Sequence, residues 1–349
     1  MTRIERLQTK GIIRSGTTNR GFQYQHADGR RVAPADLERI KQLRIPPAWT
    51  EVAITASPHA KLQVVGKDAA GRWQYLYHES HTRNQQLKKF KRLISFAEAL
   101  PKIRATVKRH LSERGLGRER VLASILRILL TCFMRPGSQV YASENGSYGI
   151  ATLRPKHVKV RGDAIEFDFP GKSGVRQQRQ LVDRDVAKVV RALLKESGNE
   201  VFKFRNGDGV FVDVKRRHIN EYIKEVMGAK FTAKDFRTWA GTLVCACALA
   251  RAGSELVEKP SERKRKMVAA IKETALILGN TPAVCRSSYV SPVILDSFQA
   301  GKMIENHFED LQDLISFNGR KLHPAEESLL MFLKSRSNQK YSRHCGCPR

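Results

Sequence analysis

Apolar residues recur at every third or fourth position over most of the chain beyond residue 90, which predicts a largely helical region. The clearest helix is predicted from Arg118 to about Phe133, with one apolar face made of Val121, Ile125, Ile128, Leu129 and Cys132. Caps, glycines and prolines bound the other predicted helices, which cover residues 95–115, 183–196, 213–227, 232–252, 261–278, 282–289 and 291 to about 317.

The first 90 residues instead show short strand-like runs separated by turns, with one helix near Ala35–Gln42. Four strand-like runs also interrupt the helical region, at residues 149–153, 157–161, 164–169 and 175–182. The fold class predicted is therefore α+β. A small, mostly β domain over residues 1–90 precedes a larger, mostly helical domain over residues 91–349 that contains a small antiparallel sheet.

The last strand of the first domain carries three aromatic residues. Trp73, Tyr75 and Tyr77 alternate with Gln74 and Leu76, so the three rings share one face of the strand. This face could stack on nucleic acid, or the rings could simply cover the core, and the pattern does not decide between the two. The basic run that follows, which includes Lys88 and Lys89, predicts an exposed connector to the second domain.

The net charge of the chain indicates what kind of molecule it binds. The 349 residues include 63 Lys and Arg against 34 Asp and Glu, a formal net charge of +29, while 41% of the residues are apolar. The apolar share favours folded domains over a solvated basic tail. Such an excess of cations favours a polyanionic partner, with nucleic acid first, although a merely basic surface would have the same composition.

Several other classes of protein are disfavoured. No window reaches the roughly 20 apolar residues of a membrane span, and the first residues lack the apolar core of a signal peptide, so we expect a soluble, cytoplasmic protein. The six cysteines have neither CxxC spacing nor a histidine at metal-ligand spacing. We therefore expect neither a zinc site nor a disulfide scaffold, and expect Cys245 and Cys247 to be core residues.

Four residues stand out as candidates for chemistry, and three of them have an ordinary alternative. Arg135 lies at the end of an apolar helix, and Lys172 lies in a glycine-bounded turn where it could be merely solvated. Arg237 begins an apolar helix, where it could form a structural ion pair or bind an anion. Tyr289 lies between two short helices, where a tyrosine usually serves packing.

Taken in order, five short segments resemble the poxvirus-like and bacterial branch of the type IB DNA topoisomerases. They are Gln74-Tyr75-Leu76-Tyr77, Met134-Arg135-Pro136-Gly137, Phe169-Pro170-Gly171-Lys172-Ser173-Gly174, Lys234-Asp235-Phe236-Arg237-Thr238-Trp239, and Leu278-Gly279-Asn280-Thr281-Pro282 through Ser288-Tyr289. No single segment is specific, but together they cover almost the whole chain. The resemblance implies relaxation of supercoiled DNA by transient cleavage of one strand.

The resemblance also implies a role for each candidate residue. Tyr289 would attack the phosphodiester and form a 3′-phosphotyrosyl link, and Arg135 and Arg237 would stabilise the charge that develops on the phosphate. Lys172 would protonate the leaving 5′-oxygen. Asn280 departs from the family, which often has histidine there, and would supply a neutral hydrogen bond.

The resemblance further implies a C-shaped clamp around double-stranded DNA, with Trp73, Tyr75, Tyr77, Lys88 and Lys89 as contacts. It implies a reaction that needs neither ATP nor a divalent metal. We expect a monomer without an obligate protein partner, associated with a bacterial nucleoid. Two alternatives remain: a tyrosine recombinase with a similar catalytic set, and a noncatalytic DNA-binding protein of the same fold.

Overall fold

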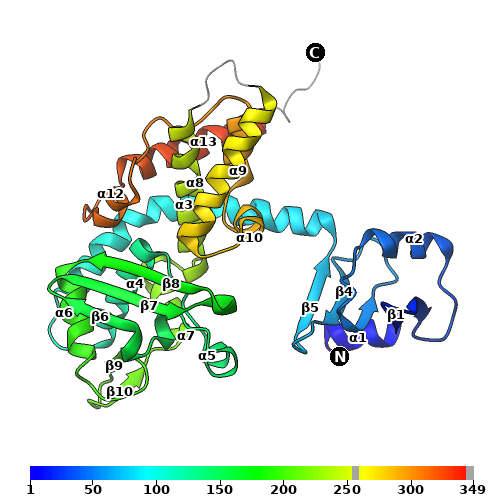
Figure 1. Ribbon diagram of the computed structural model, residues 1–349, viewed down its shortest axis with the longest axis horizontal. Helices are drawn as coiled ribbons and strands as arrows, with labels where there is room; N and C mark the ends of the chain where they lie inside the picture. The colour runs from blue at the N-terminus through cyan, green and yellow to red at the C-terminus, as the bar shows by residue number, and fades with distance from the viewer. Residues whose placement is uncertain (254–258, 343–349) are drawn as a thin grey trace. The chain divides into compact units, whose positions relative to one another are not determined.

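A computed structural model describes residues 1–253 and 259–342 (Figure 1). The chain divides into two compact units, Met1–Phe90 and Lys91–Arg349. The division falls within the long helix α3 (Glu79–Leu111). None of the helices in the described ranges has the length and apolar character that a membrane crossing requires.

The first unit is built on a five-stranded antiparallel sheet in the order β2-β1-β3-β4-β5. Its strands are β1 (Ile12–Thr17), β2 (Gly21–His26), β3 (Thr50–Ile54), β4 (Leu62–Lys67) and β5 (Trp73–Tyr77). Its other helices are α1 (Arg3–Lys10), which the sequence analysis overlooked, and α2 (Pro34–Gln42). Thr2 and Glu5 cap the start of α1 reciprocally.

Alternation along the strands places the core of the first unit on one face of the sheet. Ile12, Ile54 and Val64 are completely buried there, and Leu76 of β5 packs against the same cluster. Because neighbours along a strand point to opposite faces, Tyr75 and Tyr77 project away from this core and are 42% and 43% exposed. The shared aromatic face that the sequence predicts is therefore present.

The second unit is mainly helical and contains two small antiparallel sheets. The larger has the order β6-β7-β8 and the smaller pairs β9 with β10. The strands are β6 (Val158–Arg161), β7 (Ala164–Pro170), β8 (Arg176–Val182), β9 (Lys203–Arg205) and β10 (Phe211–Asp213). The helices after α3 are α4 (Arg118–Cys132), α5 (Gln139–Asn145), α6 (Arg184–Leu193), α7 (Arg216–Met227), α8 (Ala233–Ala252), α9 (Pro260–Leu278), α10 (Pro282–Ser288), α11 (Pro292–Gln299), α12 (Leu311–Ser316) and α13 (Pro324–Ser342).

Two apolar helices form the centre of the second unit. Helix α4 contacts α6, α7, α8 and β8, and α8 contacts α9, α11 and α13 (Figure 1). Both helices are buried over most of their length, so Cys245 and Cys247 of α8 are core residues, as the sequence predicts. Burial raises the pKa of Cys245 to about 12. Together these helices form a rigid base for the residues described next.

Two predicted segments differ in the structure. The helix predicted from Ser95 starts at Glu79, so Lys88 and Lys89, predicted as an exposed connector, lie within α3, where Lys88 is exposed and Lys89 is half-buried. No glycine or proline interrupts residues 79–100, so the helix continues through the Ser95–Glu98 pair that was interpreted as a start signal.

Three further boundaries differ. The helix predicted from Ser291 to Phe317 is two helices, α11 and α12, because Gly301 adopts a left-handed conformation just after α11 ends. Asp213, expected to cap a helix, is instead the last residue of β10, and α7 begins at Arg216. The run 149–153 contains a 3-10 turn and no strand, because its backbone contacts the loop that carries Arg135.

Candidate active site

Tyr289 lies at the junction between α10 and α11. Thr281 caps the start of α10 and Pro282 follows it, as the sequence predicts, while Tyr289 is the residue that ends the helix. Its backbone is fixed by α8: the carbonyl of Tyr289 accepts a hydrogen bond from Thr242 Oγ1 at 3.1 Å. The neighbouring Gly241 has no side chain to keep them apart, since a Cβ there would lie 2.9 Å from Tyr289 Cβ.

Arg237 lies one helical turn before Gly241 on the same face of α8. Its side chain is only 3% exposed, and its guanidinium carbon lies 5.0 Å from the centre of the Tyr289 ring. Nη1 donates to the carbonyl of Phe133, and Nη2 donates to the carbonyl of Leu278 at 2.8 Å. Nε is buried without a hydrogen-bond partner, and the Arg237 side chain also interacts with that of Tyr289 by charge and hydrogen bonding.

Arg135 follows α4, which ends at Phe133 in a left-handed conformation. The Arg135 loop is held by the segment that was predicted as a strand, because Ile150 N donates to the Arg135 carbonyl at 2.9 Å. Gly149 permits this close packing, since a Cβ there would lie 2.6 Å from the Arg135 carbonyl oxygen. These backbone contacts with the Arg135 loop replace the contacts of a sheet.

The Arg135 side chain reaches the turn between α9 and α10. Its Nη2 donates to the carbonyl of Gly279 at 3.1 Å and to Oδ1 of Asn280. Gly279 adopts a left-handed conformation that ends α9 and presents Asn280 to the site. The amide nitrogen Nδ2 of Asn280 is buried without a partner, so this side chain keeps a donor available.

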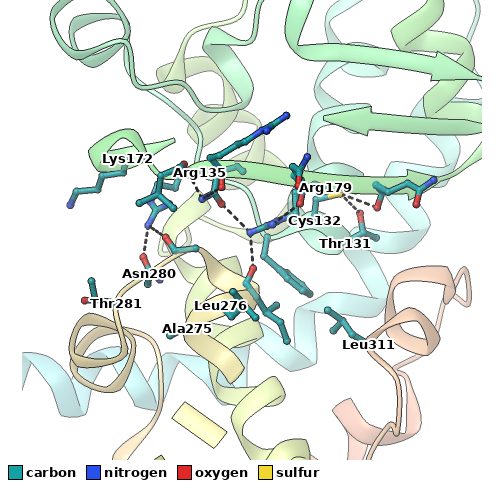
Figure 2. Close-up of a pocket in the computed structure, with 18 of the residues that line it drawn as sticks. Thr131, Cys132, Arg135, Lys172, Arg179, Ala275, Leu276, Asn280, Thr281 and Leu311 are labelled. Atoms are coloured by element: carbon teal, nitrogen blue, oxygen red, sulfur yellow. Dashed lines mark hydrogen bonds between the residues drawn. The ribbon is translucent and has the colours of Figure 1, made fainter. Parts of the chain in front are cut away.

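Lys172 lies at the tip of the hairpin between β7 and β8. The turn is closed by a hydrogen bond of 2.9 Å from Gly171 N to the Val175 carbonyl, and the Lys172 side chain is exposed. Lys172, Arg135 and Asn280 line one cavity of about 710 Å³ (Figure 2). In Figure 2 the lysine side chain extends away from Arg135 and Asn280.

The electrostatics of the site centre on Tyr289. Burial raises the pKa of its phenol, but the guanidinium of Arg237, assisted by Arg135 and Lys234, outweighs burial and brings the pKa below its ordinary value of 10. Burial, and next the charge of Arg237, lower the pKa of Arg135. The phenol therefore lies in a strongly positive field within a partly buried site.

One residue of this region was missed by the sequence analysis. Arg179 of β8 lines the same cavity, and its Nη2 donates to the carbonyl of Ile277 at 2.8 Å (Figure 2). A signal was present in the sequence: Gln177, Arg179 and Leu181 alternate on the inward face of β8, where two polar residues are unexpected.

The predicted nucleic-acid contacts belong to the first unit. The rings of Tyr75 and Tyr77 are stacked with centres 6.4 Å apart. Trp73 is half-buried, with the Lys67 ammonium 5.1 Å from its ring centre. Lys88 is exposed on α3, whereas Lys89 is half-buried with its ammonium 4.7 Å from the Phe90 ring.

Two family models and several curated proteins match this chain. The model of the eukaryotic DNA topoisomerase I catalytic core matches residues 78–313, and that of the bacterial DNA topoisomerase IB N-terminal domain matches residues 21–68. DNA topoisomerase 1B of Acanthamoeba polyphaga mimivirus is 35% identical over 304 residues, which cover 86% of this chain and 90% of that protein. DNA topoisomerase 1B of vaccinia virus is 25% identical over 266 residues, which cover 74% of this chain and 81% of that protein.

These relatives correct one expectation. The sequence analysis assigned the protein to a bacterial nucleoid, but the similar proteins named above, and a DNA topoisomerase I of monkeypox virus that is 25% identical over 266 residues, come from viruses. The assignment to bacteria is therefore wrong. The matched catalytic-core model covers more than half of the chain, and the mimivirus relative is similar over nearly its full length. The chain therefore belongs to the type IB family of DNA topoisomerases, which are isomerases that act on DNA.

Proposed function

We propose that the protein relaxes supercoiled duplex DNA by cutting one strand through a 3′-phosphotyrosyl intermediate, allowing the strand to rotate and resealing it. One observation carries the proposal: the Tyr289 ring lies 5.0 Å from the Arg237 guanidinium carbon, in a field that lowers the pKa of the phenol. A phenol whose anion is stabilised is a better nucleophile near neutral pH.

In the cleavage step the Tyr289 oxygen forms a bond to phosphorus and the bond from phosphorus to the 5′-oxygen breaks. The phenolic proton passes to water, and the 5′-oxygen takes up a proton from Lys172. The negative charge thus stays on the phosphodiester, which is now an ester of tyrosine. Because one phosphodiester replaces another, the step is close to balanced and runs backwards when the 5′-hydroxyl attacks.

Charge builds up on the nonbridging oxygens in the transition state, and cationic donors stabilise it. Arg237 would donate through the unpaired Nε, and Asn280 through the unpaired Nδ2. Arg135 would add its charge, since its guanidinium is directed at the Asn280 side chain. Two fixed donors and the added charge of Arg135 can take the part that a divalent metal takes in other phosphoryl-transfer sites.

Lys172 is the proposed acid. Gly171 and Gly174 flank its hairpin tip, and Ser173 adopts a left-handed conformation there, so the tip is built as a tight turn that presents the lysine to solvent. In Figure 2 the Lys172 side chain extends away from Arg135 and Asn280. The proposal requires the ammonium to turn towards the 5′-oxygen when DNA binds.

The remaining parts of the proposal concern DNA itself. Contacts to the phosphate backbone would supply most of the affinity, given the net charge of +29. The exposed rings of Tyr75 and Tyr77 would pack against the duplex from the first unit. The protein would act as a monomer, without ATP and in the presence of EDTA.

The test is to trap the intermediate on a suicide DNA substrate whose 5′-labelled strand loses its short leaving segment after cleavage. Wild-type protein in EDTA is expected to form a denaturant-resistant adduct. Tyr289→Phe should form none while still binding DNA, and the control Tyr141→Phe, which alters an exposed phenol on α5, should behave like wild type. An adduct with Tyr289→Phe would refute the assignment of the nucleophile.

Plasmid relaxation separates the rival functions. Relaxation of a plasmid of arbitrary sequence supports the topoisomerase. A recombinase would require two specific sites, and a noncatalytic DNA-binding protein would be unaffected by Tyr289→Phe.

A further inference from the structure

The C-terminal end of α9 holds three arginines on three consecutive carbonyls. Arg179 donates to Ile277 at 2.8 Å, Arg237 to Leu278 at 2.8 Å, and Arg135 to Gly279 at 3.1 Å. The last carbonyls of a helix have no partner within the helix and lie at the negative end of its dipole. A guanidinium group donates hydrogen bonds to these carbonyls and carries a positive charge that the negative end of the dipole attracts. The helix end is therefore a common anchor for the three side chains.

These arginines come from three different parts of the second unit. Arg135 follows α4, Arg237 belongs to α8 and Arg179 belongs to β8. Arg135 and Arg237 are the proposed transition-state donors, and the end of α9 fixes where their guanidinium groups lie. Arg179 is held further by its own strand, because Nη1 donates to the Gln178 carbonyl at 2.7 Å.

A glutamine connects this anchor to the lysine hairpin. Arg179 Nη2 donates to Oε1 of Gln177 at 3.0 Å, and the Gln177 side chain is only 7% exposed. A Cβ on Gly279 would lie 2.3 Å from that oxygen, and a Cβ on Gly171 would lie 2.7 Å from Gln177 Cγ. Gln177 therefore fills the space between the base of the Lys172 hairpin and the turn that presents Asn280.

We propose that Arg179 is a positioning residue for the strand-cleavage reaction, acting with Gln177. It holds the end of α9 against β8, and so fixes Asn280 and the carbonyl anchors of Arg135 and Arg237 relative to the Lys172 hairpin. Arg179 itself makes no contact with the reacting phosphate. The proposal rests on the proposed function for its catalytic consequence, but its structural consequence can be measured without DNA.

The catalytic test is single-turnover cleavage of the suicide substrate at saturating protein. Arg179→Met should slow cleavage by about a hundredfold, because small misplacements of catalytic groups have effects of that size. The Kd for DNA should change by less than about threefold, since only a step after binding is affected. Arg179→Lys keeps one donor for the Ile277 carbonyl and should recover most of the rate.

The matched control is Arg251→Met. Arg251 is also a partly buried arginine that donates to a backbone carbonyl, that of Phe308 at 2.9 Å, and it pairs with Glu273 of α9; neither residue lines the cavity that Arg179 lines. This variant should be less stable than wild type. Under conditions in which it is folded, it should cleave at the wild-type rate. A double-mutant cycle should show strong coupling of Arg179→Met with Asn280→Ala, and none of Arg251→Met with Asn280→Ala.

Hydrogen exchange of the free protein gives the readout that does not depend on cleavage. The amides of Gly279 and Asn280 donate to Leu276 and Ala275, and they should exchange at least about tenfold faster in Arg179→Met but not in Arg251→Met, because their local opening becomes easier. Unchanged exchange would overturn the inference, as would wild-type cleavage by Arg179→Met or additive effects with Asn280→Ala. If wild-type protein forms no adduct, the proposed function fails, while the exchange result still decides whether Arg179 holds the end of α9 in place.

Discussion

The two regions proposed to meet DNA are built in different ways. The aromatic face of the first unit comes from one strand, β5, and its tyrosines are 42% and 43% exposed. The site of the second unit gathers the end of α4, the β7–β8 hairpin, α8, the end of α9 and the end of α10, and its Arg237 is 3% exposed. One surface is local and open, whereas the other is assembled from distant segments and largely buried.

This difference indicates how each region tolerates change. An exposed ring on a strand can be replaced without disturbing the fold, so its loss should weaken binding alone. A buried guanidinium that donates to two carbonyls cannot be removed without leaving those carbonyls unsatisfied. Substitutions in the second unit should therefore affect the chemical step, and substitutions in β5 should affect binding.

The largest effect is expected for Arg237→Ala. Loss of a transition-state donor typically costs a factor of about 100 to 1,000 in rate, and here the charge beside the phenol is lost as well. We expect saturated cleavage to fall by about a thousandfold or more. Arg237→Lys should remain strongly impaired, because the single nitrogen of an ammonium cannot reproduce the planar guanidinium, in which Nη1 and Nη2 bind the Phe133 and Leu278 carbonyls while Nε stays available. A lysine variant with the wild-type rate would contradict the arrangement.

Asn280 should show an intermediate effect. Asn280→Ala removes the acceptor for Arg135 and the unpaired donor Nδ2, and we expect cleavage to fall by about 10- to 100-fold. Asn280→His keeps a ring nitrogen that can donate and should retain activity. Equal rates for Asn280→Ala and wild type would remove this residue from the site.

Gly241→Ala tests how closely α8 must approach Tyr289. Alanine favours a helix more than glycine does, but its Cβ would lie 2.9 Å from Tyr289 Cβ and 3.0 Å from the Tyr289 carbonyl oxygen. We expect the free energy of unfolding to fall by about 1–3 kcal/mol. We also expect the protein that remains folded to cleave DNA more slowly than wild type. Gly207→Ala, where a Cβ would meet nothing within 4 Å, is the control. Cleavage at the wild-type rate by Gly241→Ala would show that the close approach is dispensable.

The smallest effect on chemistry is expected in β5. Tyr75→Ala and Tyr77→Ala should each cost about 1 kcal/mol of binding free energy, or about a fivefold rise in Kd for duplex DNA. Cleavage at saturation should stay at the wild-type rate. Tyr75→Phe keeps the ring and should bind nearly as well as wild type. A Tyr75 or Tyr77 variant that bound DNA normally but cleaved it slowly would contradict the assignment of binding to β5 and of chemistry to the second unit.

Local signals in the sequence were sufficient for much of the fold. Thr281 and Pro282 predicted the start of α10 and the position of Tyr289 at its end, and Thr232 predicted the start of α8. The alternation in β5 predicted that its aromatic residues share one face, although it left open whether that face is exposed. These features depend on neighbours within a few residues, and the resemblance to the family supplied the functional set.

Features that depend on distant contacts could not be predicted in this way. The run 149–153 has the composition of a strand. In the structure Gly149 packs against the Arg135 loop, and the backbone of the run forms hydrogen bonds with that loop in place of a neighbouring strand. The Ser95–Glu98 pair resembles a helix start, yet α3 passes through it. For Arg179, alternation along β8 indicates only an inward-facing side chain, whereas its partner, the Ile277 carbonyl, lies 98 residues further along the chain.

The most direct test of the positive field around Tyr289 is a titration of its phenol. The ultraviolet difference titration of wild-type protein minus Tyr289→Phe isolates this group from the other seven of the eight tyrosines. Nearby cations favour the phenolate, so the midpoint should lie below 10, and Arg237→Gln should move it upwards. A midpoint at or above 10 in the wild-type protein would contradict the account.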